Sequence, residues 1–99
     1  MLNITKNLDS TGLYFSLEGR LDTITAPQLE SEVKASVDGI DKITFDCAKL
    51  EYISSAGLRV LLFTQKIMNE KGSMVVRNVS EEIMEIFEVT GFVNILTID

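Results

Sequence analysis

The chain has 99 residues and a formal net charge of −6, and it is 45% hydrophobic and 24% charged. These values predict one globular domain, residues 1–99, with a core large enough to fold without disulfides or metal. The acidic balance argues against a nucleic-acid-binding protein, which would carry a basic patch, and favours a partner with a basic face.

Scarce residue types narrow the functional classes further. Cys47 is the one cysteine, so we expect no internal disulfide, a reducing compartment and a buried thiol that acts as a small hydrophobe. Histidine is absent, which excludes the Ser-His-Asp triad and histidine-based zinc sites. No apolar run approaches the roughly 18 residues of a membrane span, and no signal peptide is evident. We therefore expect a cytoplasmic protein that is not an enzyme and binds no cofactor or metal.

The chain begins with a predicted hairpin and a predicted helix. Residues 2–6 and 13–17 alternate apolar and polar side chains on either side of a segment rich in turn formers, which is typical of a β-hairpin. Residues 19–25 are interpreted as a connection. Thr25 is the expected N-cap of a helix that continues to about Val37, with Gln28 three places after it as in a capping box.

The middle of the chain predicts a strand and a longer helix. Residues 40–45 form the expected strand, and a short loop then leads to a helix from about Ser55 to Lys71. Ser54 is the expected N-cap of this helix, and Gly72 is expected to end it in a left-handed conformation. A helix of this length between two strands suggests a parallel β-α-β unit.

The last third predicts one more strand and one more helix. Residues 74–79 form the expected strand, Ser80 caps the helix that follows, and Thr90-Gly91 stops it. Residues 92–98 are expected to end the chain as an extended segment. The predicted fold class is therefore α/β: a mixed sheet, parallel in its centre, with an N-terminal hairpin and three to four helices packed mainly on one side.

The strongest functional signal lies where the long helix begins. Ser54 and Ser55, followed by the small Ala56 and Gly57, occupy a helix N-terminus, where unpaired N–H groups and the helix dipole create an electropositive spot. A phosphate would be tolerated there. From the residues alone, a simple helix cap explains both serines, and a phosphorylated switch is the alternative.

Taken together, these segments resemble a STAS domain, and specifically a stand-alone bacterial anti-sigma factor antagonist. The resemblance covers nearly the whole chain and rests on segments that occur in the family's order and spacing. They are Gly19-Arg20-Leu21-Asp22 with Thr25-Ala26, Ile43-Thr44-Phe45-Asp46 with Leu50, Ile53-Ser54-Ser55-Ala56-Gly57-Leu58, and Val89-Thr90-Gly91-Phe92-Val93-Asn94-Ile95.

The resemblance implies a protein-binding switch. Family members bind an anti-sigma factor that is also a serine kinase with a GHKL-type ATP fold, and they sequester it while unphosphorylated. The kinase phosphorylates the antagonist at the position that is Ser55 here, and a PP2C-type phosphatase removes the phosphate. The implied partner-binding residues are Asp22, Thr25, Ser54, Ser55, Ala56, Gly57 and Arg59. We expect no direct contact with nucleic acid or membrane, and a monomer, with a weak dimer as the alternative.

Two departures from the family's switch motif leave choices open. The family's acid before the phosphorylated serine is Ser54 here, and its second hydroxyl is Ala56. Ser54 therefore competes with Ser55 as the modified residue, although a capping role would occupy its oxygen and favour Ser55. Arg59 could pair with an acidic partner residue, pair with the phosphate, or be solvated. Asp22 could contact the partner or only satisfy local N–H groups in an Asx turn.

Two rival functions remain beside the antagonist. The same fold could serve as a phospho-switch or scaffold module in another partner-switching pathway, in secretion or stress signalling. A more remote alternative is a small-molecule or nucleotide binder that uses Ser54, Ser55 and Asp22, although the G-x-x-x-x-G-K motif of P-loop proteins is absent.

Overall fold

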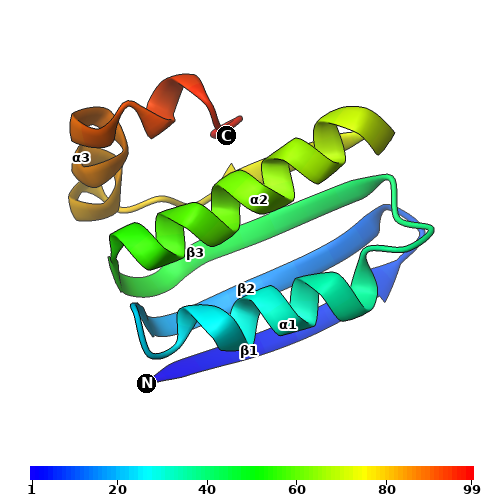
Figure 1. The fold of residues 1–99 in the computed structure, drawn as a ribbon, viewed down its shortest axis with the longest axis horizontal. Coiled ribbons are helices and arrows are strands. Elements are labelled where there is room, and N and C mark those ends of the chain that lie inside the picture. The colour runs from blue at the N-terminus through cyan, green and yellow to red at the C-terminus, as the bar shows by residue number, and fades with distance from the viewer.

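A computed structural model describes residues 1–99 as a four-stranded mixed sheet with helices packed on it. The strand order is β1-β2-β3-β4, with β1 antiparallel to β2 and the other neighbours parallel. Figure 1 shows α1 and α2 lying across one face of the sheet. The elements are β1 (Leu2–Asp9), β2 (Gly12–Leu21), α1 (Ala26–Ser36), β3 (Lys42–Ile53), α2 (Ser55–Lys71), β4 (Ser73–Arg77), α3 (Glu81–Thr90) and the 3-10 helix η1 (Phe92–Asn94). This arrangement confirms the predicted fold class.

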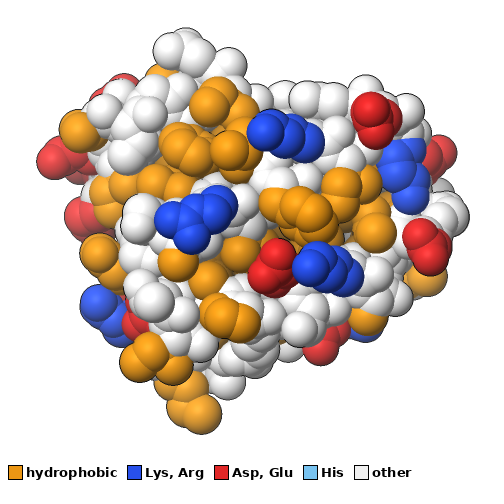
Figure 2. Space-filling model, in the orientation of Figure 1, with side chains coloured by type: hydrophobic (Ala, Val, Ile, Leu, Met, Phe, Trp, Pro, Cys, Tyr) orange, Lys and Arg blue, Asp and Glu red, His pale blue; other side chains and the backbone are white.

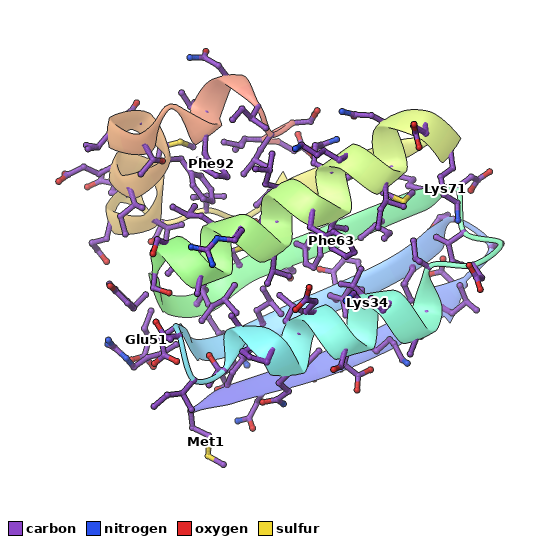
Figure 3. All side chains as sticks on the ribbon, viewed as in Figure 1. Met1, Lys34, Glu51, Phe63, Lys71 and Phe92 are labelled. Atoms are coloured by element: carbon purple, nitrogen blue, oxygen red, sulfur yellow. The ribbon has the colours of Figure 1, made fainter.

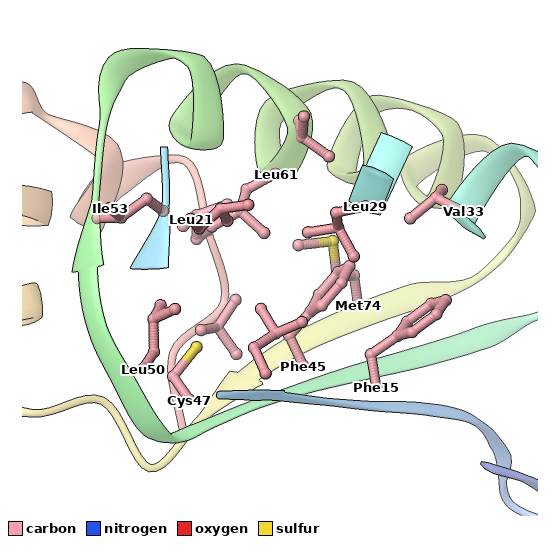
Figure 4. Close-up of a cluster of buried hydrophobic side chains, with 14 of the residues drawn as sticks. Phe15, Leu21, Leu29, Val33, Phe45, Cys47, Leu50, Ile53, Leu61 and Met74 are labelled. Carbon is pink, nitrogen blue, oxygen red and sulfur yellow. The ribbon is translucent and has the colours of Figure 1, made fainter. Parts of the chain in front are cut away.

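The core lies between the sheet and the two long helices. The alternation along β2 buries Leu13, Phe15 and Leu17 on the side that faces the helices. Phe15 stacks on Phe45 of β3, with ring centroids 5.4 Å apart. Figure 4 shows both rings pointing from the strands toward the helix layer, Phe45 toward Leu29 and Phe15 toward Val33. Burial of such rings and leucines removes apolar surface from water, which is the main force that holds the layers together.

Cys47 belongs to this core, as the sequence indicated. Its side chain is fully buried on β3 among the hydrophobic residues shown in Figure 4. Burial, with a smaller contribution from the neighbouring Asp46 carboxylate, raises the pKa of the thiol to about 12. The reactive thiolate is therefore scarce at neutral pH, and Cys47 acts as a packing residue.

The strands are longer than the sequence predicted, and this changes the geometry of the functional region. β3 continues to Ile53 where we expected a strand to end at Phe45, and β2 continues to Leu21 through part of the expected connection. The two extensions pair in parallel, with Leu21 opposite Ile53. No loop therefore separates β3 from α2, and Ser54 alone joins them.

The extended segment expected over residues 92–98 is wrong for most of its length. Gly91 adopts a left-handed φ of 81° and turns the chain into η1, and the amide of Leu96 then donates to the carbonyl of Phe92 at 2.9 Å. Only Ile98 pairs with the sheet, through an isolated parallel bridge to Val76 of β4. The turn carries Leu96 into the core. The apolar residues of this segment fit an extended chain equally well, so the sequence pattern does not predict the turn.

Three predicted caps have different outcomes. The Ser54 and Ser80 oxygens accept hydrogen bonds from the third amide of their helices, at 3.4 Å and 3.3 Å, as expected. Gly72 ends α2 but is not left-handed, since its φ is 170°. A glycine is required at this position because a Cβ would collide with the backbone carbonyl of Asp41.

Gly57 fixes how closely the first turn of α2 approaches the sheet. This residue is buried. A Cβ added there would lie 2.7 Å from Leu21 Cγ and 2.8 Å from Ile53 Cγ1. Those distances are shorter than van der Waals contact, so a larger residue would push α2 away from the ends of β2 and β3.

Gly57→Ala gives a test of this packing that depends on the sign of the effect. At an exposed helix position, alanine would stabilise the fold by about 1 kcal/mol relative to glycine. Because Gly57 packs against Leu21 and Ile53, we expect the free energy of unfolding to fall by about 1–3 kcal/mol instead. Urea denaturation measures the change, and Glu70→Ala at an exposed position of the same helix is the control. A more stable Gly57→Ala variant would show that α2 does not approach the sheet this closely.

Candidate functional site

The candidate site lies at one end of the sheet, where β2 and β3 both finish. The two strands run parallel, so the segments that follow them leave from the same edge, as Figure 1 shows for the starts of α1 and α2. The amide of Ser54 donates to the carbonyl of Leu21 at 2.9 Å and joins the two exits directly. Binding sites in α/β proteins commonly lie outside the carboxyl ends of parallel strands.

Asp22 holds the connection after β2 from within. Its Oδ1 accepts hydrogen bonds from the amides of Ile24 and Thr25, both at 3.0 Å. The Thr25 amide is the main cause that lowers the pKa of this carboxyl below that of an ordinary aspartate, so Asp22 is charged at neutral pH. This geometry is the Asx turn that the sequence left open as an alternative, and it makes the loop rigid whether or not a partner contacts Asp22.

Thr25 occupies the N-cap position of α1, but its side chain does not cap the helix, contrary to the prediction. Its hydroxyl donates to the carbonyl of Arg20 at 2.7 Å and accepts from the amide of Asp22 at 2.9 Å, so the oxygen is used inside the loop. The backbone carbonyl of Thr25, rather than its side chain, accepts from the amide of Gln28 at 3.0 Å. Thr25 is only 8% exposed, which makes it a support for the loop rather than part of its surface.

The two serines differ in their surroundings. Ser54 is half-buried, and its oxygen accepts the capping hydrogen bond from Gly57. Ser55 is exposed at the first residue of α2, and its hydroxyl makes no hydrogen bond within the chain. Ser55 therefore presents a free hydroxyl at a helix N-terminus, where the helix dipole favours an anion.

Two shallow hollows border this end of α2. One, of about 420 Å³, lies between α1 and α2, and its lining includes Thr23, Pro27, Ala56 and Phe63. The other, of about 300 Å³, lies between α2 and the residues around η1 and is lined by Ser55, Leu58, Arg59, Leu62, Thr90 and Phe92. Arg59 lines both hollows and so stands between them. Figure 2 shows hydrophobic side chains gathered on this face with lysine and arginine side chains among them.

Side chains from other elements complete the borders of the hollows. In Figure 3, Phe63 of α2 lies beside Lys34 of α1, and the Lys34 ammonium is 5.5 Å from the ring centroid. Lys34 also pairs with Glu30 at 3.5 Å. Phe92 extends from η1 toward α2 on the other side. The Lys34–Glu30 pair lies within α1, whereas the contacts of Phe63 with Lys34 and of Phe92 with α2 join separate elements and were not expected from the sequence.

The structure thus brings together most of the predicted site residues and separates them by depth. Asp22, Ser54, Ser55, Ala56 and Arg59 reach the surface, whereas Thr25 and Gly57 are buried beneath them. Sequence reasoning missed Ile24, which lies 87% exposed on the loop that Asp22 holds. A single apolar loop residue carries no periodic signal, so only its exposure identifies it. No three or more Cys, Asp and Glu side chains lie close enough to hold a metal ion, and no helix is long and apolar enough to cross a membrane.

The amide signals of Ile24 and Thr25 allow a test of the Asx turn by pH. We expect them to titrate with the Asp22 pKa, below that of an ordinary aspartate. Because the folded pKa is lowered, the stability that the carboxylate contributes is complete above the unfolded pKa and is lost as the pH falls through the folded value. NMR titration of the Ile24 and Thr25 amide signals measures the Asp22 pKa in the folded chain. The Asp22→Asn substitution should abolish the transition. A midpoint at or above the ordinary aspartate value would contradict the hydrogen bonds described here.

Comparisons with known proteins agree with this architecture. The STAS domain family matches residues 2–99. BtrV of Bordetella bronchiseptica, whose name classes it with the anti-sigma factor antagonists, is 38% identical over 84 residues, which span 83% of this chain and 72% of BtrV. The anti-sigma-B factor antagonist of Bacillus subtilis is 27% identical over 99 residues, which span 98% of this chain and 90% of that protein.

Solved structures show the same fold at lower sequence identity. The anti-sigma factor antagonist from Mycobacterium paratuberculosis superposes with a TM-score of 0.89 at 20% identity, over 99% of this chain and 85% of that one. The unphosphorylated form of the anti-sigma factor antagonist SpoIIAA gives a TM-score of 0.77 at 14% identity, over 98% and 87% of the two chains. With the family matched over nearly every residue, the chain belongs to the STAS domain family and, within it, to the anti-sigma factor antagonists.

Proposed function

We propose that this chain is the antagonist in a phosphorylation-controlled partner switch. Its unphosphorylated form binds and sequesters an anti-sigma factor with a GHKL-type serine kinase fold, which frees a sigma factor for transcription. Phosphorylation of Ser55 weakens that binding. The observation that carries the proposal is the Ser55 hydroxyl, exposed and without a hydrogen bond at the start of α2, while the neighbouring Ser54 oxygen is used as the cap.

The site explains how a phosphate could act without unfolding the domain. A phosphoserine adds about 1.5 to 2 negative charges at neutral pH, and a helix N-terminus accommodates such a group. Against a partner surface that offers no cation of its own, the same charge must lose its hydration without compensation from the partner. A penalty of about 3 kcal/mol at the interface would weaken binding about 100-fold, which is enough for a switch.

The partner surface has an exposed rim and a buried support. We assign the contacts to Asp22, Ser54, Ser55, Ala56 and Arg59, and we add the exposed Ile24 as an apolar contact. Thr25 and Gly57 act indirectly, Thr25 by holding the loop and Gly57 by letting α2 approach the sheet. A surface that is already ordered loses little conformational entropy on binding, which favours affinity.

The switch operates in a single domain that meets a kinase and a phosphatase. Residues 1–99 act as one domain, which is supported by a single cluster of 23 buried hydrophobic residues. The net charge of −6 suits a partner with a basic face. A PP2C-type phosphatase restores the unphosphorylated form, and the protein works as a monomer in the cytoplasm.

Substitution of the two serines tests the proposal. With GHKL-type kinases encoded in the same genome and ATP present, we expect mass spectrometry to find phosphate on Ser55 of the wild type and none on Ser55→Ala. Ser55→Ala should bind the kinase as tightly as the unmodified wild type, and Ser55→Asp about 100-fold more weakly if the charge acts at the interface.

Ser54→Ala is the matched control in the same helix turn. It should still be phosphorylated on Ser55, while loss of the cap lowers its unfolding free energy by about 1 kcal/mol. Phosphate on Ser54 instead, or equal binding by Ser55→Ala and Ser55→Asp, would contradict the assignment of Ser55 as the switch.

A further inference from the structure

Arg59 is placed one helical turn after Ser55 on the same face of α2. Both residues are exposed, and both line the hollow between α2 and η1. Residues four apart on a helix lie about 5–6 Å from each other at their Cβ atoms, and an acidic group placed N-terminal to a basic one is the favourable order. A phosphate on Ser55 would therefore lie within reach of the Arg59 guanidinium.

Nothing else in this hollow competes for that guanidinium. Arg59 forms no ion pair, because all four ion pairs of the chain involve other residues. The other side chains that line the hollow are uncharged: Leu58, Leu62, Thr90 and Phe92. The Thr90 hydroxyl is already used, since it donates to the carbonyl of Ile86. Arg59 is thus the one charged side chain that lines the hollow between α2 and η1.

The second hollow provides no stronger site for Arg59. Its one acidic residue is Glu30, and that carboxylate already pairs with Lys34 at 3.5 Å. Without a phosphate, the Arg59 guanidinium therefore has no ion-pair partner within the chain. It lies between the two hollows, where an acidic group of a partner can reach it. A guanidinium binds carboxylates and phosphates in the same two-pronged geometry, so the two anions would compete for it.

We infer that a phosphate on Ser55 is bound by Arg59 of the same helix, so that phosphorylation removes this cation from the partner surface as well as adding negative charge. The inference rests on the proposed function for its biological role. It decides between the open roles of Arg59, because the residue serves the partner in one state of the switch and the phosphate in the other. The phosphate is then partly neutralised within the chain, and part of the loss of binding comes from the lost contact of Arg59.

The test uses the full chain with phosphoserine incorporated at position 55 during translation, so that neither a kinase nor a partner is needed. Phosphorus NMR follows the second ionisation of the phosphate in this protein and in its Arg59→Gln, Arg59→Lys and Lys66→Gln variants. Lys66 is an exposed cation of the same helix, about 16 Å along the axis from Ser55, so its removal controls for a change in net charge.

The expected result is a phosphate pKa that is lower with Arg59 than in Arg59→Gln by about 0.3 unit or more, with Arg59→Lys between them. Lys66→Gln should leave the value unchanged, since screening weakens charges beyond about 10 Å. Equal values in the parent and Arg59→Gln, or equal shifts in Arg59→Gln and Lys66→Gln, would overturn capture by Arg59. Either outcome leaves phosphorylation of Ser55 and partner binding to be judged by the serine substitutions, so failures of the two proposals are distinguishable.

Discussion

The parallel pairing of β2 with β3 out to Leu21 and Ile53 is the constraint on which the functional end of this molecule depends. It places the carbonyl of Leu21 where the amide of Ser54 donates to it, at 2.9 Å. The loop that Asp22 holds and the first turn of α2 therefore lie beside each other without any intervening segment. Since Ser54 alone connects β3 to α2, its oxygen caps the helix and Ser55 is left at the surface.

The same end of the sheet shows a division between buried and exposed residues. Thr25 ties the loop to Arg20, Gly57 lets α2 lie against Leu21, and neither presents much surface. The exposed residues around Ser55 are already held in position, so binding costs little further conformational entropy. A change of charge among them therefore alters binding at the interface and leaves the fold unchanged. A regulatory charge can then act strongly while the core around Phe15 and Phe45 stays intact.

Local sequence patterns predicted the elements and caps that depend on near neighbours. They identified the fold class, the Ser54 and Ser80 caps and the burial of Cys47, because each is set by short-range periodicity or composition. They missed the extension of β3, where the polar Lys49 and Glu51 interrupt the apolar pattern although the backbone continues to pair. They also could not show that Gly57 faces the sheet, because α2 carries apolar residues on more than one of its faces. Nor could they show that the chain turns after Gly91 instead of extending.

If a phosphate on Ser55 changes the surface without changing the fold, amide NMR spectra with serine and with phosphoserine at position 55 should differ only near the site. We expect shifts confined to the loop of Asp22, the first two turns of α2 and the hollow that reaches Phe92. Shifts that extend to the β1–β2 hairpin or to the core around Phe45 would contradict it, because they would show that the phosphate acts by rearranging the domain.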